Sequence, residues 1–427
     1  VMSKHIVVIG AGVVGASVAH HCLRAGLKVT LLEPGKPGDA QAASFGNAGW
    51  LSSHSILPPA YPGVWKQVPK WLLNPQGPLT VRWRHLPKAI PWLSAYLASA
   101  WTHQQVKNTS ISLRALLRDA PNLHKEMANQ IGVGNLICVR EVLHTYPTQS
   151  DYEADSFGWE IRRDAGVTWQ CLNKQHLHDL EPELNAMYEW GVLVDGTGYC
   201  LNPSDYVKAL VEDSLQAGAT LTRASAHSFN FINGKLVSVN TSVGVIKCDA
   251  AVIAAGARAK ELAFQAGDHL PLATERGYHY VVQASGQGPN HPTMFMDQKV
   301  IVTPLSLGIR IAGQVEIAGL DDSPNWQRAE ILRQHLATLY PRLADNISTD
   351  HINVWMGRRP SLPDGLPCIG FSSGSQSIIH AFGHGHVGLA SSARTGRLVA
   401  QLLTNTSPEI DLKPFRPQRF KNKLSVS

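Results

Sequence analysis

The sequence predicts an α/β fold in which a parallel βαβ domain is interleaved with a second, mainly antiparallel α+β domain. The 427-residue chain opens on a strand, helix and strand pattern, and it closes on a glycine-rich segment that leads into a helix. Between these ends lie two separate blocks of short apolar runs, which are typical of antiparallel strands. A chain of this length suits two domains or one large discontinuous fold.

The opening stretch, KHIVVIGAGVVGASVAHHCLRAGLKVTLLE, supports the parallel part of this prediction. The apolar run His5–Ile9 is typical of a strand buried on both faces, and Gly10, Gly12 and Gly15 follow it in the spacing G-x-G-x-x-G. In this motif the first glycine permits a tight turn, the second lets a pyrophosphate approach the backbone, and the third lets the helix pack on the strand. Phosphate oxygens then lie at the positive end of the helix.

A second strand is expected over Val29–Leu32, and Glu33 stands at its end, where a carboxylate can accept both hydroxyls of an adenosine ribose. Val14, within the glycine motif, is expected to lie along the same ligand. The order of strand, glycines, helix, strand and acid indicates a Rossmann-like dinucleotide-binding unit. The alternative is a structural βαβ unit that binds nothing.

Composition restricts the other function classes. The formal net charge is +6 without a block of Lys and Arg, so a mild preference for anionic ligands and no nucleic-acid partner are expected. The six cysteines lie far apart without a C-x-x-C pair, which indicates reduced thiols and neither a disulfide framework nor a metal site. No run approaches the ~18 apolar residues of a membrane span, and no signal peptide precedes the first strand, so a cytoplasmic location is expected.

Two further segments carry specific patterns. AASFGNAGWLS occupies residues 42–52, and GRRPSLPDGLPCIG at 357–370 is followed by HAFGHGHVGLASSARTGRLVA at 380–400. With the opening motif, these segments resemble the D-amino-acid oxidase superfamily of FAD enzymes, and within it the bacterial D-amino-acid dehydrogenase branch. The resemblance implies that the first segment contributes three residues to an FAD site, namely Ser44, Asn47 and Gly49. A flexible Gly/Ser loop is the alternative.

In the closing block, the resemblance places Arg359 where the family binds an amino-acid carboxylate. A planar guanidinium suits bidentate carboxylate binding, which lysine does less well. Arg358 beside it is expected to serve structure, although the two could exchange roles. His384 is expected near the substrate, yet the family's reaction needs no histidine base. The backbone amides at the following helix start can stabilise negative charge on a reduced flavin, and they belong to Gly383, Gly385, Val387 and Gly388.

The middle of the chain is less specific. Residues 50–101 are rich in tryptophan, and Pro91 is expected to break a short amphipathic helix there. This surface could touch a membrane or a quinone, and packing on the enzyme body is the alternative. A polar helix with one buried face is expected from Ser110 to about Ile131.

Strand-like runs fill residues 136–201, and a helix capped by Asn202 or Ser204 is expected to end at Gly218. The run DAAVIAAGA then reaches Gly256, which by the resemblance passes near the FAD, as does the backbone of Ala226.

Residues 268–356 read as the second antiparallel block. Tyr278 and Tyr280 should share one face of a strand, with His279 on the other. The hydroxyl of Tyr278 could bind a substrate carboxylate, and ordinary strand aromatics are the alternative reading.

These patterns divide the chain into seven segments. An FAD-binding domain is expected from 1–60, 201–267 and 357–412, and a substrate domain from 131–200 and 268–356. A Trp-rich helical segment at 61–130 and a solvated basic tail at 413–427 complete the division.

The implied reaction is oxidation of the Cα–N bond of a small amino or imino acid, with FAD taking the hydride and water hydrolysing the imine to a keto acid. FAD is expected to bind without a covalent link, because neither 42–52 nor 380–400 contains a cysteine; His54 and His384 are the remaining candidates for a tether.

The electron acceptor is expected to be quinone or oxygen. The alternatives are an oxygen-using oxidase of glycine, sarcosine or iminodiacetate, an FAD-bearing subunit of a multi-subunit amine or hydroxyproline dehydrogenase, and a nicotinamide-dependent dehydrogenase. An oligomer and a peripheral contact with the inner face of the membrane are further expectations.

Overall fold

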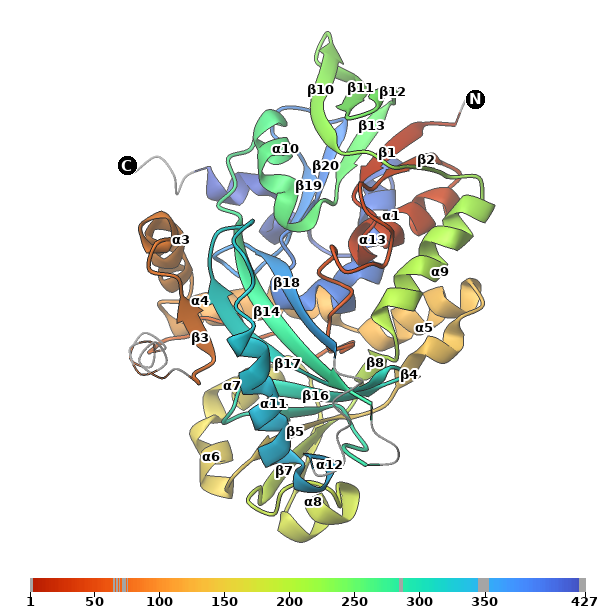
Figure 1. The fold of residues 1–427 in the computed structure, drawn as a ribbon. Coiled ribbons are helices and arrows are strands. Elements are labelled where there is room, and N and C mark those ends of the chain that lie inside the picture. The colour runs from red at the N-terminus through yellow and green to blue at the C-terminus, as the bar shows by residue number, and fades with distance from the viewer. Residues whose placement is uncertain are drawn as a thin grey trace.

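Two large sheets organise the chain in its computed structural model, which describes residues 3–63, 66, 68, 70, 74, 76–283, 287–344 and 353–421. A six-stranded sheet has the order β19-β20-β13-β1-β2-β9, and a nine-stranded sheet lies below it in the view of Figure 1. Segments distant in the sequence alternate between the two sheets. The predicted interleaved α/β architecture is therefore the one observed.

The six-stranded sheet is parallel except for its antiparallel edge strand β19. Its central strands are short and apolar, as a sheet covered on both faces requires. The strands are β1 (His5–Ile9), β2 (Lys28–Leu32), β9 (Thr220–Thr222), β13 (Ala250–Ile253), β19 (Cys368–Phe371) and β20 (Ile378–Phe382).

Helices cover one face of this sheet and a small sheet with a short helix covers the other. The helices are α1 (Val13–Arg24), α9 (Pro203–Gln216) and α13 (Gly388–Leu403). The opposite layer contains β10 (Ala226–Ile232), β11 (Lys235–Thr241), β12 (Gly244–Lys247) and α10 (Ala259–Gln265). The first and last helices pack closely, because a Cβ on Gly396 of α13 would lie 2.5 Å from the carbonyl oxygen of Ser17 in α1.

The nine-stranded sheet has the order β18-β14-β17-β16-β15-β5-β7-β6, with β3 paired to the end of β17. Most neighbours are antiparallel, as predicted. The strands are β3 (Leu79–Val81), β5 (Val142–Tyr146), β6 (Trp169–Leu172), β7 (Trp190–Val194), β14 (Ala273–Val282), β15 (Thr293–Phe295), β16 (Val300–Leu305), β17 (Gly308–Ile317) and β18 (Asn353–Ser361).

The two faces of this sheet have different roles. Tyr278 and Tyr280 of β14 lie in the core beneath α11 (Gln327–Leu339). His279 points the other way, where its ring stacks on Trp355 and its Nδ1 lies 3.2 Å from the carbonyl oxygen of Gly46. The predicted alternation is confirmed, and we call the side of His279 the cavity face.

The remaining helices surround the nine-stranded sheet and the lower end of the six-stranded one (Figure 1). They are α3 (Leu86–Ser99), α4 (His103–Leu117), α5 (Ala120–Gln130), α6 (Gln149–Ala154), α7 (Ser156–Asp164), α8 (Lys174–Leu180) and α12 (Pro341–Ala344), and a separate ribbon joins β4 (Ile137–Val139) to β8 (Gly198–Cys200). Among the described residues, no helix is long and apolar enough to cross a membrane.

Two helix predictions were wrong. Pro91 does not break α3, which runs through it and is held by burial of Ala89 and Trp92. The single helix expected from Ser110 to Ile131 is two helices, because Asp119 takes a left-handed conformation (φ 61°) and Pro121 starts the second one.

Two boundaries also differ from the prediction. β18 extends the nine-stranded sheet to Ser361, so residues 357–361 belong to that sheet and not to the FAD domain. The basic tail is packed up to residue 421, since Phe415 and Phe420 are buried and Arg419 forms an ion pair with Asp364. Residues 422–427 lie outside the described chain.

Candidate active site

A cavity of about 1590 Å³ lies between the carboxyl ends of the parallel strands and the cavity face of the nine-stranded sheet. Its volume exceeds the ~300–1,000 Å³ typical of a single small-ligand pocket, which leaves room for a dinucleotide and a substrate together. Fourteen of the predicted site residues line this cavity. They are Gly10, Gly12, Val14, Glu33, Ser44, Asn47, Ala226, Gly256, Arg359, Gly383, His384, Gly385, Val387 and Gly388.

The turn after β1 is shaped by its glycines. Gly10 has φ +104°, and a Cβ there would lie 2.5 Å from the carbonyl oxygen of Ala254 at the end of β13. A Cβ on Gly15 would overlap the carbonyl oxygen of Gly10, so Gly15 brings helix and strand together and is not among the cavity-lining residues. Gly12 lines the cavity with open space around it, which suits a pyrophosphate.

Glu33 closes the second strand at the cavity wall. Its Oε2 accepts a hydrogen bond from the Ala11 backbone at 2.9 Å, and its Oε1 accepts one from the Gly35 backbone at 3.0 Å. The carboxylate is buried and also lines the cavity. It is therefore fixed in orientation with lone pairs left for ribose hydroxyls.

The segment at residues 42–52, which follows Glu33, contributes a buried polar group without a hydrogen-bond partner among the described residues. The Ser44 hydroxyl is buried and has no hydrogen bond within the described residues, yet Ser44 lines the cavity. Asn47 accepts from the Gly49 backbone at 2.8 Å, which holds the loop in shape. Gly49 itself (φ +82°) packs against the Cys200 carbonyl and is not a lining residue, so its predicted place along the ligand is corrected to a structural one. An unpaired buried hydroxyl facing a glycine-lined cavity fits a bound dinucleotide.

The closing segment lies beside these loops. Gly383 (φ +83°) follows β20, and the short helical turn Gly385–Val387 leads into α13 at Gly388. The helix start therefore faces the cavity, where its backbone amides can meet negative charge.

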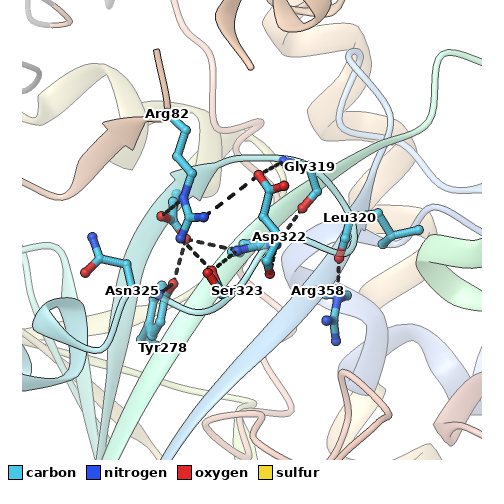
Figure 2. Close-up of polar contacts among 10 residues, drawn as sticks. Arg82, Tyr278, Gly319, Leu320, Asp322, Ser323, Asn325 and Arg358 are labelled. Carbon is cyan, nitrogen blue, oxygen red and sulfur yellow. Dashed lines mark hydrogen bonds and ion pairs between the residues drawn. The ribbon is translucent and has the colours of Figure 1, made fainter. Parts of the chain in front are cut away.

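Arg359 reaches into the cavity from β18. Its guanidinium covers Gly277, where any Cβ would collide with it, and its Nη1 donates to the Gln314 carbonyl at 3.2 Å. Burial lowers the pKa of Arg359, whereas the nearby Glu275 carboxylate raises it. Arg358 points to the opposite face and donates to the Leu320 carbonyl at 2.7 Å, as Figure 2 shows.

Tyr278 does not fit its predicted role. Its hydroxyl donates to Glu316 at 2.6 Å. It also accepts from the backbone of Asn325 at 2.9 Å, and Figure 2 shows the two residues side by side. Glu316 is itself buried and pairs with Arg82 and Arg276. Burial and the bond to Glu316 raise the pKa of Tyr278 to about 12. The hydroxyl belongs to this structural network on the far side of the sheet and is not available to a substrate.

The prediction for His384 is corrected as well. His384 lines the cavity, but its ring is buried and its Nε2 lies 3.1 Å from the Thr395 hydroxyl in α13. Burial lowers the pKa of His384 to about 3, which keeps the ring neutral. His386 instead faces Glu275, with 3.2 Å between Nε2 and Oε2.

Sequence reasoning named only His54 from one group of lining residues, as a candidate tether, and missed the other three. His54, His144, Arg162 and Lys299 meet at the end of the cavity formed by β5, β16 and α7. They come from four separate segments, and no local motif joins them. They come together because β15 pairs with β5 on one side and with β16 on the other.

A Rossmann-type dinucleotide site that opens onto an antiparallel sheet bearing a half-buried arginine defines the class of two-domain flavin-dependent oxidoreductases. The chain belongs to the family described as FAD dependent oxidoreductases (DAO), whose model matches residues 5–402. FAD is accordingly its cofactor, and the expected family and fold are confirmed.

Three relatives illustrate the family. The chain is 52% identical over 417 residues, 98% of this chain and 99% of the relative, to a protein named D-amino-acid oxidase in Bradyrhizobium diazoefficiens. It is 29% identical over 430 residues, 98% of this chain and 99% of the relative, to a D-amino acid dehydrogenase of the same organism. The crystal structure of glycine oxidase from Geobacillus kaustophilus shares the fold, with a TM-score of 0.73, 21% identity and coverage of 98% and 99% of the two chains.

Proposed function

We propose that the protein oxidises the Cα–N bond of a small amino or imino acid, with D-amino acids as the first candidates. The observation that carries the proposal is Arg359, a half-buried cation over Gly277 whose side chain donates a single hydrogen bond within the described residues, to the Gln314 carbonyl. Its other N–H groups can therefore bind a carboxylate in a bidentate manner. The names of the two relatives support an amino acid as the substrate.

The residues of the chain contribute mainly by positioning the substrate and by excluding water from the reacting carbon. Arg359 would fix the carboxylate, and the cavity face around Ile301 and Ala312 would exclude water from the reacting carbon. FAD, when bound, supplies the hydride acceptor. The product imine would be hydrolysed by water to a keto acid and ammonia or an amine. None of these steps needs a histidine base from the chain.

FAD is proposed to be held by the backbone of Gly10 and Gly12, by Glu33 at the ribose, by Ser44 and Asn47 along the ligand, and by the closing glycines at the ring. Ala226, Gly256 and Val14 would add contacts at the adenine and phosphate end. These roles rest on their place in the cavity wall and on the unpaired hydroxyl of Ser44.

The acceptor of the electrons is the second part of the proposal. Trp83 and Trp101 flank α3 and are 73% and 64% exposed, and Ile90 on the helix is exposed as well. Trp83 also lines the cavity, so this surface borders its mouth. We propose that it is a peripheral contact with the inner face of a membrane and that it gives a quinone access to the flavin site. Sedimentation with anionic vesicles, compared with a Trp83→Gln, Trp101→Gln variant, tests it. Self-association stays a prediction that light scattering can measure.

The decisive test of the reaction is substrate-dependent bleaching of the flavin. Under anaerobic conditions, a panel of D-amino acids, glycine, sarcosine and iminodiacetate should include at least one compound that removes the yellow colour. Re-oxidation by oxygen or by a quinone analogue then identifies the acceptor. If no member of the panel reduces the flavin, the amino-acid proposal is wrong.

A further inference from the structure

The backbone of residues 40–47, which we call the cofactor loop, is held by the nine-stranded sheet. The neighbouring strands β18, β14 and β17 (Figure 1) each carry one side chain that reaches this loop, and these side chains are Trp355, His279 and Arg310. Trp355 pairs with His279, which in turn pairs with Ala312, two residues from Arg310. Because alternate residues of a strand share a face, all three side chains lie on the cavity face.

Arg310 makes the shortest of these contacts. The residue is 3% exposed, and its Nη1 donates to the Asn47 carbonyl at 2.5 Å and to the Phe45 carbonyl at 3.4 Å. Within the described residues, its Nε is buried without a hydrogen-bond partner. Burial lowers the pKa of Arg310 to about 10, so the guanidinium stays charged at neutral pH. A buried charge is costly unless it is hydrogen-bonded, so the arginine and the conformation of the loop depend on each other.

His279 binds the carbonyl between these two. Its Nδ1 lies 3.2 Å from the Gly46 carbonyl oxygen, and Nδ1 must carry the proton because a carbonyl oxygen only accepts. Burial, together with the charge of Arg310, lowers the pKa of His279 to about 3, so the ring is neutral. The carbonyls of Phe45, Gly46 and Asn47 therefore all accept hydrogen bonds from the nine-stranded sheet.

Trp355 adds a fourth hydrogen bond and an apolar surface. Its indole Nε1 donates to the Ala40 carbonyl at 2.8 Å, and its ring stacks on His279 with 5.2 Å between the ring centroids. A Cβ on Gly46 would overlap the indole ring, so the loop passes directly against the tryptophan. Close approach to Trp355 therefore explains the glycine at position 46.

The cofactor loop also lines the cavity, through Ser44, Gly46 and Asn47 among others. The hydroxyl of Ser44 is the buried polar group that has no partner within the described residues. Arg310 and His279, in contrast, are not among the residues that line the cavity. Their effect on a ligand in the cavity must therefore pass through the backbone of the loop.

Ordering this loop in advance has a consequence for binding. Fixing the backbone of one residue in a single conformation costs about 1–2 kcal/mol. A ligand that meets a loop already held in its bound shape does not bear that cost, and it binds more tightly as a result. Hydrogen bonds to three successive carbonyls of the loop provide such an arrangement.

We propose that Arg310, assisted by His279, is a positioning residue for FAD. It fixes the cofactor loop in the shape in which Ser44 and Asn47 meet the cofactor. The inference rests on the proposed contacts of Ser44 and Asn47 with FAD. It adds that the sheet that carries Arg359 also determines how tightly the cofactor is bound.

The test compares FAD binding in the holoenzymes of the parent, Arg310→Met and the control Arg328→Met. Arg328 is also buried, and its Nη1 also donates to two oxygens, those of the Gly77 carbonyl and the Gln314 side chain. Each holoenzyme is diluted, and the released FAD is separated by ultrafiltration and quantified by its fluorescence. Arg310→Met should weaken FAD binding about tenfold or more, because hydrogen bonds from a charged group are lost, whereas Arg328→Met should stay within about twofold of the parent. Parent-like affinity in Arg310→Met, or an equal loss in both variants, would overturn the proposal.

Two conservative variants keep the proposal testable if Arg310→Met does not fold. Arg310→Lys keeps a charged donor, so it should lose less affinity for FAD than Arg310→Met. His279→Phe keeps the ring that stacks on Trp355 but removes the N–H group, so it should weaken FAD binding as well. Parent-like affinity in both of these variants would contradict the proposed role.

A double-mutant cycle separates positioning from a general structural loss. Ser44→Ala should weaken FAD binding in the parent but add little in Arg310→Met, where the loop is already misplaced. Losses that simply add would show that Arg310 does not act through the loop, and they would overturn the proposal. No effect of Ser44→Ala in the parent would overturn the proposed Ser44 contact, and the comparison of Arg310→Met with Arg328→Met would still decide the role of Arg310. None of these measurements needs a substrate, so a failure of the proposed amino-acid oxidation is detected separately.

Discussion

Glu275 and Arg359 are directly opposite each other on β14 and β18, and the same carboxylate is held from the FAD side by His386 at 3.2 Å. Glu275 thus joins the sheet that carries the carboxylate-binding arginine to the loop that precedes α13. Burial opposes ionisation of Glu275, but the hydrogen bond from His386 and the charges of His386 and Arg359 outweigh it, so its pKa is lowered.

This link predicts a pH-dependent stability. The pKa of Glu275 is lower in the folded than in the unfolded protein, so its stabilising contribution is present above the unfolded value near 4.5 and is lost as pH falls through the folded one. Glu275→Gln should therefore lower the thermal midpoint at pH 7, and the difference from the parent should shrink progressively below pH 4.5. Melting curves of both proteins across this range check it. A difference that does not depend on pH would contradict it.

Glu33 is expected to be the main polar contact to the ribose. Glu33→Ala removes charge-assisted hydrogen bonds worth roughly 1.5–3 kcal/mol, so FAD affinity should fall about ten- to a hundredfold. Glu33→Gln keeps the shape and serves as the matched control, with a smaller loss. Fluorescence titration of the apoprotein with FAD measures both. Unchanged affinity would show that Glu33 serves only the turn at Ala11 and Gly35.

We predict that FAD is bound without a covalent link. No cysteine lines the cavity within the described chain. The nitrogens of His54 are within hydrogen-bonding distance of Ser52 and His144, and Nε2 of His384 meets Thr395. Acid precipitation should leave the yellow colour in the supernatant. Colour that stays in the pellet would contradict the prediction.

Tyr278 should matter for stability and not for substrate binding. Tyr278→Phe removes the hydrogen bond to Glu316 and leaves a buried carboxylate less satisfied, which should cost about 1–3 kcal/mol in the free energy of unfolding. The KM for the best amino acid should stay within about twofold. Denaturant titration and steady-state kinetics measure the two effects separately, and a large rise in KM without a loss of stability would restore the original prediction.

The sequence predicted most of what local patterns determine. The spacing of Gly10, Gly12 and Gly15, the acid at position 33 and the alternation around His279 are each set by a few neighbouring residues. The direction of the Tyr278 hydroxyl was not predictable, because it depends on Glu316 and Asn325, more than thirty residues away.

The same reasoning explains what was missed at the site. Arg162 and Lys299 line the same cavity because β5 pairs with β15. The spacing of apolar residues along the sequence does not reveal which distant strands pair. The break at Asp119 follows from a single left-handed residue inside a helical pattern. The pairing of distant strands and the left-handed conformation of single residues are therefore the parts of this fold that the sequence alone could not reveal.

The central claim, that Arg359 binds the substrate carboxylate, is tested most directly by kcat/KM of Arg359→Lys and Arg359→Leu on the best amino acid, with flavin content measured in parallel. Lysine keeps the charge but loses the planar fork, so kcat/KM should fall for Arg359→Lys and much further for Arg359→Leu, while FAD content stays normal. Arg358→Leu, whose residue contacts Leu320, should change kcat/KM far less. Parent-like activity in Arg359→Leu, with activity abolished in Arg358→Leu, would move the assignment one residue earlier. Full activity in both variants would contradict the account of this site.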